Sequence, residues 1–226
     1  MRAELLCSCG LALISQGKTL LIDVPNENLP PFFAISEEKM REILKKTGIF
    51  SQISGLIFTH LHPDHYDAAL AEAVSCAHPD ARIYLPDRCE PEQSVFTAGP
   101  FTIERHRFAH TPAPKFPDVA HDVLLISDGE KLVYVTADAA PDAEAHRRIL
   151  NGRTADAAFW NSQYLSYPET RALLRGCAGV SYIYHMPVDD ADVSGIRRKC
   201  ERNMQRFGAE LPNVRVLTHY PSILDI

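Results

Sequence analysis

The sequence contains no hydrophobic run long enough to cross a membrane. Residues 5–14 and 19–24 are largely apolar, but a polar stretch around Gln16-Gly17 separates them. A membrane-spanning helix needs roughly 18 to 20 apolar residues in succession, whereas two short apolar runs around a Gln-Gly pair are typical of a hairpin. Because Glu4 also interrupts the basic N-terminal end, we expect two strands, no signal peptide and a cytoplasmic protein.

An excess of positive charge is also missing. The chain has 23 Lys and Arg residues against 29 Asp and Glu residues, a formal charge of −6 and a pI near 5.9. A protein that binds extended nucleic acid usually presents a basic surface that neutralises many phosphates. We therefore expect a small-molecule substrate, no extended nucleic acid and no membrane partner. The sequence leaves the oligomeric state open, with a homodimer as one option.

The cysteines show no disulfide framework, since their spacings do not repeat. Scattered cysteines in a cytoplasmic protein are expected as reduced thiols in or near the core. Cys7 and Cys9 form a Cys-X-Cys pair, but this spacing alone is a weak sign of metal binding, and whether the pair binds anything stays open. The six cysteines are Cys7, Cys9, Cys76, Cys89, Cys177 and Cys200.

Linkers and low-complexity segments are absent as well. With 226 residues, a mass of 25.2 kDa, 46% hydrophobic residues and 23% charged residues, the chain suits one folded domain over residues 1–226. Strand-like and helix-like segments alternate along it, which predicts a mixed α/β fold. Near the C-terminus we expect a helix over residues 189–207 and a closing strand over residues 214–218.

The most informative stretch that is present runs from His60 to His65. It follows the apolar run 55–58, which predicts a buried strand, and precedes residues 66–76, which predict a helix that Asp64 could cap. Three imidazoles and a carboxylate would thus project from one short connection. These donors suit zinc, manganese or iron, whereas a structural zinc site usually relies on several thiolates.

The sequence Thr-His-Leu-His-Pro-Asp-His at residues 59–65 resembles the HxHxDH signature of the metallo-β-lactamase-fold hydrolases. The resemblance covers essentially the full length, although only this motif is specific by itself. It implies a four-layer αββα sandwich and two adjacent divalent metal ions. By resemblance, His60 and His62 bind the first ion, and Asp64 and His65 bind the second.

The family needs three further ligands, and each should stand at the end of a strand. His110 follows the predicted strand 101–108 and is preferred over His106 and His121. Asp138 follows the strand 131–136 and takes the place of the aspartate that bridges the two metals in the family. His185 follows the strand 180–184 and is preferred over His219.

The implied chemistry is hydrolysis by a hydroxide that bridges two divalent metals, with zinc expected first and manganese or iron as alternatives. Asp64 would orient the attacking water and take its proton. His219 is the first choice for protonating the leaving group, with His121 or a tyrosine as alternatives.

A small phosphodiester is the favoured substrate, and an ester, thioester or lactone is the alternative. The run Asn161-Ser162-Gln163-Tyr164 stands where the members that mature transfer RNA carry a glutamate-centred motif, which argues against that activity. A third hypothesis is a non-hydrolytic di-iron protein, although that class usually carries a flavin domain, which these residues do not provide.

Overall fold

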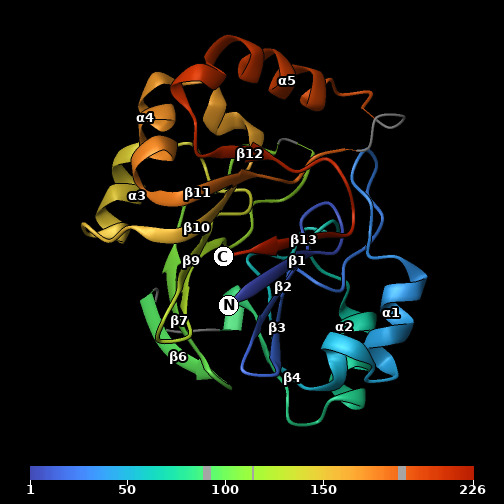
Figure 1. Ribbon diagram of the computed structural model, residues 1–226. Coiled ribbons are helices and arrows are strands. Elements are labelled where there is room, and N and C mark those ends of the chain that lie inside the picture. Colours follow the sequence, from blue (N-terminus) through green and yellow to red (C-terminus); the bar gives the residue numbers. More distant parts are fainter. Residues whose placement is uncertain (89–92, 114, 188–191) are drawn as a thin grey trace.

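Two β-sheets lie face to face in the computed structural model, which describes residues 1–88, 93–113, 115–187 and 192–226 (Figure 1). The first sheet has the strand order β13-β1-β2-β3-β4-β5, in which β3, β4 and β5 run parallel to one another. Its strands are β1 (Arg2–Leu5), β2 (Leu11–Ser15), β3 (Lys18–Ile22), β4 (Ile53–Ile57), β5 (Arg82–Tyr84) and β13 (Ser222–Asp225).

The second sheet has the strand order β12-β11-β10-β9-β8-β7-β6, and its strands from β9 to β12 are parallel. The strands β6 to β9 are antiparallel neighbours in chain order. The bounds are β6 (Gln93–Ala98), β7 (Phe101–Arg107), β8 (Asp122–Ser127), β9 (Leu132–Val135), β10 (Ala155–Trp160), β11 (Ala178–Ile183) and β12 (Val214–Val216).

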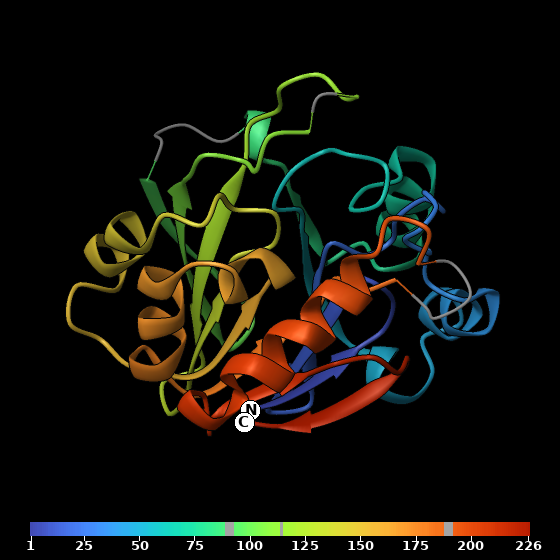
Figure 2. The same cartoon turned by 90° about the horizontal axis from the view of Figure 1, so that it is seen from above.

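Helices cover the outer face of each sheet, as Figures 1 and 2 show. The helices α1 (Glu37–Leu44) and α2 (Ala68–Ala77) lie on the first sheet, and α3 (Ala143–Leu150), α4 (Pro168–Gly176) and α5 (Ile196–Phe207) lie on the second. Short 3₁₀ turns lie in the connections between these helices and the strands: η1 (Gly48–Ser51), η2 (Pro86–Arg88), η3 (Ser162–Leu165) and η5 (Gly208–Glu210). The four-layer αββα sandwich that the sequence predicts is confirmed.

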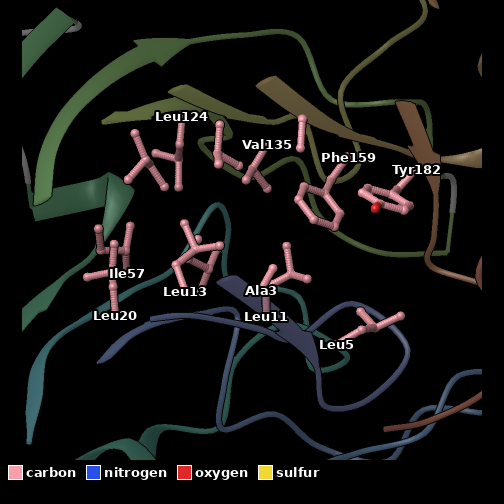
Figure 3. Packing of buried hydrophobic residues seen from close by; sticks show 14 of the residues in the cluster. Ala3, Leu5, Leu11, Leu13, Leu20, Ile57, Leu124, Val135, Phe159 and Tyr182 are labelled. Atoms are coloured by element: carbon pink, nitrogen blue, oxygen red, sulfur yellow. The ribbon is translucent and has the colours of Figure 1, made fainter. Parts of the chain in front are cut away.

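The central core lies between the two sheets, because alternate residues of each strand point to opposite faces. Leu11 and Leu13 of β2 face Leu124 of β8 and Val135 of β9 across the interface (Figure 3). Ala12, between the two leucines, instead packs under the helices of the first sheet. Both faces of these strands are therefore buried, which explains why their sequences are continuous apolar runs.

Three local expectations need correction. The residue that caps α2 is Asp67, whose side chain accepts a hydrogen bond from Leu70 N–H, and not Asp64. The chain closes with β13 rather than with the strand near residues 214–218, and β13 pairs with β1 at the edge of the first sheet. The helix expected over residues 189–207 is seen as α5 from Ile196, and its first predicted residues, 189–191, lie outside the described part of the chain, as does Cys89.

No helix in the described ranges is both long and apolar enough to span a membrane.

The helix α3 is tied to the second sheet by a buried hydrogen-bonded chain. The Tyr164 hydroxyl donates to the Ala140 carbonyl at 2.9 Å and lies 2.5 Å from His146 Nε2, while the Tyr134 hydroxyl lies 2.6 Å from His146 Nδ1. Because Tyr164 uses its proton on the carbonyl, His146 must donate from Nε2 and accept at Nδ1. Burial lowers the pKa of His146 to about 3, so the neutral imidazole is the folded form.

Because His146 is neutral in the folded protein, we expect the free energy of unfolding to fall in acid. His146 titrates near its ordinary pKa of about 6.5 when unfolded, so between that value and its folded pKa the unfolded chain binds the additional proton. Lowering the pH from 7 to 5 should thus remove about 2 kcal/mol of unfolding free energy through this group. Urea unfolding at both pH values should show a smaller pH dependence for His146→Gln than for the wild type, and an equal dependence would contradict the assignment.

Candidate metal centre

The connection after β4 presents four polar side chains from one tight turn. The backbone N–H groups of His65 and Tyr66 donate to the His62 carbonyl at 2.9 and 3.0 Å, which folds the chain back on itself. His60, His62, Asp64 and His65 are all at most 6% exposed. The motif therefore concentrates four buried donors at the carboxyl end of a parallel strand.

Asp23 anchors this turn from the neighbouring strand β3. Its carboxylate accepts hydrogen bonds from the Thr59 backbone N–H at 2.7 Å and from the Thr59 hydroxyl at 2.8 Å. It also lies 2.9 Å from His65 Nδ1. A proton on Nδ1 satisfies this contact and leaves His65 Nε2 as the nitrogen directed at the other donors.

His60, His62 and His110 form the first group of donors, whose nitrogens lie within 4.8 Å of one another. His110 Nε2 is 3.4 Å from His60 Nε2. His62 Nε2 is 3.2 Å from the Pro117 carbonyl, which leaves His62 Nδ1 available to the group. Three converging imidazoles are a donor set that zinc accepts with a fourth position open.

Asp64, His65, Asp138 and His185 form the second group, also within 4.8 Å of one another. The Nε2 atoms of His65 and His185 are 2.9 Å apart, and the Asp64 carboxylate lies 3.3 Å from His185 Nε2. Two imidazoles and two carboxylates suit zinc, iron or manganese. The rings of His65 and His185 are nearly parallel, with 17° between their planes.

The Asp138 carboxylate stands between the two groups. Its oxygens lie 4.0 Å from His60 Nε2 and 3.7 Å from His110 Nε2 on one side, and 3.7 Å from His65 Nε2 and 3.9 Å from His185 Nε2 on the other. A carboxylate with two oxygens so placed is suited to bridge two adjacent cations.

Hydrogen bonds fix the turn that carries Asp138. Ala137 has a left-handed backbone with φ of 45°, which is unfavourable for a residue with a Cβ. The Asn161 side-chain amide donates to the Ala137 carbonyl at 3.0 Å and to the Ala139 carbonyl at 3.2 Å. The Thr111 N–H donates to the Asp138 carbonyl at 2.8 Å. The ends of β7, β9 and β10 are thereby joined at the site.

The charges of the centre are strongly interdependent. Burial lowers the pKa of His60 well below its usual range, so its imidazole is neutral and has a lone pair to offer. Burial would also lower the pKa of His65, but the carboxylates of Asp23 and Asp64 raise it well above its usual range. For Asp138 burial would raise the pKa, yet His185 and His65 lower it well below its usual range. The buried carboxylates therefore demand positive charge, which a protonated His65 or a bound cation can supply.

The observed donors fit a pair of divalent cations. The nitrogen atoms of His65 and His185 lie within hydrogen-bonding distance of each other, and all seven predicted ligands fall into two groups. Such a convergence of buried nitrogen and oxygen donors has no role in apolar packing. The metal ligands expected from the sequence are therefore brought together, namely His60, His62, Asp64, His65, His110, Asp138 and His185.

Two other histidines singled out in the sequence, His106 and His219, lie outside the two donor groups. His106 is paired with Glu104 at 3.6 Å, away from the donor groups. His219 is exposed, with the Thr218 hydroxyl 3.1 Å from its Nδ1, and it does not line either of the two pockets at the centre. The geometry gives no support to His219 as the proton donor, and that role stays a prediction.

His121 is buried beside the first donor group. Its ring centre lies 5.1 Å from that of His60 and 5.4 Å from that of His110. Neither ring nitrogen has a hydrogen-bond partner among the described residues, and burial lowers the pKa of His121 well below its usual range. Together with His62 and His110 it lines a pocket of about 330 Å³. A neutral, unpaired imidazole is thus available near the centre.

A second pocket, of about 220 Å³, opens directly on the second donor group through His185 and Asp138. Its walls are mainly apolar or uncharged, and no Lys or Arg occurs among the described residues that line it. These wall residues are Phe32, Thr111, Pro112, Ala113, Asn161, Ser162, Gln163 and Ile196, with His110 at the border of the first group.

The roles of Phe32 and Asn161 at the centre were not predicted from the sequence. The Phe32 ring stands edge-on to the His185 ring, with centres 4.1 Å apart, although the two residues are far apart in the chain. No local pattern could have shown this contact. Asn161 had a signal, since it follows the end of a predicted strand, but its hydrogen bonds to the Asp138 turn depend on how β9 and β10 pair.

No protein-family model matches this chain, and no curated protein matches it either. Several solved structures match it. An isothiocyanate hydrolase from Delia radicum gut bacteria is 14% identical with a TM-score of 0.67, and the alignment covers 100% of this chain and 99% of the other. A metallo-β-lactamase-fold protein from Bacillus subtilis is 15% identical with a TM-score of 0.64 and 98% coverage of both chains.

A diiron β-hydroxylase from Streptomyces venezuelae is 11% identical with a TM-score of 0.68, and the alignment covers 100% of this chain but 54% of the other. Identities this low show the fold alone. The chain therefore has the metallo-β-lactamase fold, and the fold supports both hydrolases and a diiron hydroxylase.

The contact between Asp23 and His65 can be used to test the second donor group. Asp23→Asn keeps a residue type that tolerates the observed φ of 53° but replaces one oxygen with an amide nitrogen that cannot accept a hydrogen bond. Loss of such a supporting contact typically weakens metal binding about 10- to 100-fold. Chelator competition with zinc should show this loss for one of two ions.

Thr59→Ala is the comparison variant, because it removes a hydroxyl from the same carboxylate and leaves the contact between Asp23 and His65 in place. It also removes the 3.2 Å contact of that hydroxyl with His60 Nδ1 in the first donor group. It should therefore weaken binding of the ion at His65 less than Asp23→Asn does. Unchanged zinc affinity in folded Asp23→Asn protein would show that Asp23 does not position His65 for a metal.

Proposed function

We propose that this protein is a dinuclear metal-dependent hydrolase of small molecules. The observation that carries the proposal is the position of Asp138, whose carboxylate lies within 4.0 Å of histidines from both donor groups. Two groups that share a carboxylate in this way suit two adjacent cations rather than one. Zinc is proposed as the resident metal, with manganese or iron as alternatives that the same donors accept.

Two bound divalent cations would supply a water of lowered pKa and would polarise the group under attack. The residues of this chain provide the rest. Asp64 belongs to the second donor group and holds its carboxylate 3.3 Å from His185, where it could orient the water and accept its proton. Asn161 holds the turn that carries Asp138, and Asp23 holds the ring of His65.

The balance of charge at the centre limits the substrate. Two divalent cations, the Asp64 and Asp138 carboxylates and the attacking hydroxide would together leave one positive charge, which can balance a singly charged anion. A small phosphodiester has one negative charge and two oxygens that could meet both cations. It is therefore the first substrate class proposed. A phosphate monoester, with its second charge, would gain from a Lys or Arg, and none lines this pocket among the described residues.

An ester, thioester or lactone is the second substrate class, and the pocket walls favour it. Phe32, Pro112, Ala113 and Ile196 offer apolar surface, while Asn161 and Gln163 offer hydrogen bonds without charge. Such walls bind a neutral acyl compound at little desolvation cost. The isothiocyanate hydrolase of the same fold is named for a neutral substrate, which is consistent with this alternative.

Turnover of a chromogenic phosphodiester, a thioester and a lactone by zinc- or manganese-loaded protein tests the proposal. We expect hydrolysis of at least one class. Asp64→Ala should lower turnover by at least about 100-fold, since positioned acid–base groups contribute on the order of 10²- to 10⁴-fold. His106→Ala, which removes a histidine outside both donor groups, should keep the wild-type rate.

The pattern of turnover decides between the two classes. Cleavage of the phosphodiester alone supports the first, and cleavage of the thioester or lactone alone supports the second. If the metal-loaded protein hydrolyses none of the three, or if Asp64→Ala is as active as the wild type, the hydrolase proposal is wrong in its present form.

A further inference from the structure

A cysteine sulfur lies against the second donor group from the side of the core. Cys9, in the loop between β1 and β2, has its Sγ within 4.8 Å of donor nitrogens of both His65 and His185. The side chain is fully buried, and its S–H donates a hydrogen bond to the Asp64 backbone carbonyl, with the Sγ 2.7 Å from the oxygen. A thiol thus faces the same two imidazoles that Asp64 and Asp138 face.

The neighbouring thiol of Cys7 does not share this position. Cys7 packs in the apolar cluster beneath the helices of the first sheet, whereas Cys9 belongs to the core between the sheets. The Cys7 Sγ donates to the Asn26 side-chain oxygen at 3.4 Å and accepts from the Gly10 N–H at 3.3 Å. Both thiols have hydrogen-bond partners, but of the two only Cys9 lies in a donor group with the histidines.

The position of Cys9 is held from two directions. The Asn26 side-chain amide donates to the Asp64 carbonyl at 2.8 Å and lies 3.9 Å from the Cys9 Sγ. The loop that carries Cys9 is thus connected through Asn26 to the turn that carries Asp64. The hydrogen bond from Cys9 to the Asp64 carbonyl joins the sulfur to the same turn.

We propose that Cys9 supplies a thiolate ligand to the ion held by His65 and His185. This inference rests on the proposed function, since it adds a donor to one of the two metal positions. Cys9 with the two histidines makes one donor group, and the two carboxylates with the same histidines make the other. Cys9 would therefore bind from the core side, since it belongs to the cluster between the sheets and does not line the pocket.

Ligation converts the thiol to a thiolate. The S–H bond would break, its hydrogen bond to the Asp64 carbonyl would be lost, the proton would leave to the solvent, and a bond from sulfur to the metal would form without any change of oxidation state. A sulfur donor shifts the preference of this position from manganese towards zinc and cobalt, because softer ligands favour those ions. The donor thus bears on which metal the protein uses.

Cobalt titration of the metal-free full-length protein tests the inference, because Co²⁺ bound to a thiolate has a charge-transfer band in the near ultraviolet. The wild type should develop this band as cobalt binds. Cys9→Ser should bind cobalt without the band, and Cys7→Ser, the matched control two residues away, should retain it. A band that persists in Cys9→Ser, or that disappears in Cys7→Ser alone, would overturn the assignment.

X-ray absorption of the zinc-loaded wild type gives an answer that does not depend on the folding of a variant. A sulfur neighbour at about 2.3 Å from zinc is expected, in addition to nitrogen and oxygen at about 2.0 to 2.2 Å. A zinc shell of nitrogen and oxygen alone would overturn the inference. Cys9→Ser should also bind one of the two zinc ions at least about tenfold more weakly.

Metal content separates this inference from the proposed function. Two bound cobalt ions per chain without the charge-transfer band would remove Cys9 from the ligand set and leave the dinuclear centre intact. Fewer than two ions together with the band would support Cys9 and contradict the dinuclear centre. Fewer than two ions without the band would contradict both.

Discussion

Both sheets bring the carboxyl ends of their parallel strands to the same edge of the sandwich, and the centre depends on this arrangement. β3 and β4 of the first sheet lead to Asp23 and His60, and β9 and β11 of the second lead to Asp138 and His185. Polar groups at a strand end leave the apolar interface between the sheets intact. The sandwich can thus hold a dense cluster of buried donors without placing them inside its core.

Burial of this cluster removes charged groups from water, and apolar packing cannot compensate the free energy that this costs. The carboxylates of Asp23, Asp64 and Asp138 are drawn together around imidazoles, two of which, His60 and His65, are shielded from water. Taking charged groups out of water is expensive unless opposite charge compensates it. The pKa of His60 is lowered and that of His65 is raised, which shows that the carboxylates favour positive charge at His65. Two bound cations would compensate the carboxylates more completely than one proton on His65 can.

The sequence was most informative where chemistry is local. The HxHxDH motif places its four donors within one turn, so their proximity follows from chain connectivity alone. Strands with both faces buried produced recognisable apolar runs, and Asp138 and His185 could be proposed from their positions just after such runs. The four-layer architecture followed from the resemblance that the motif carries, and the structure confirms it.

Features that depend on contacts between distant parts of the chain were harder to predict from the sequence. β13 adds to the first sheet from the far end of the chain, and Phe32 reaches His185 from a loop more than a hundred residues away. Cys9 was visible as part of a Cys-X-Cys pair, but its separation from Cys7 required the bend between β1 and β2. His219 also follows a predicted strand, but it is exposed and lies outside the two donor groups, so its role stays a prediction.

The most direct test of the dinuclear centre is anomalous X-ray diffraction at the zinc edge from crystals of the zinc-loaded protein. We expect two peaks about 3.5 to 4 Å apart, with Asp138 between them. One peak should lie among His60, His62 and His110, and the other beside His65 and His185. A single peak, or peaks away from these residues, would contradict the central claim.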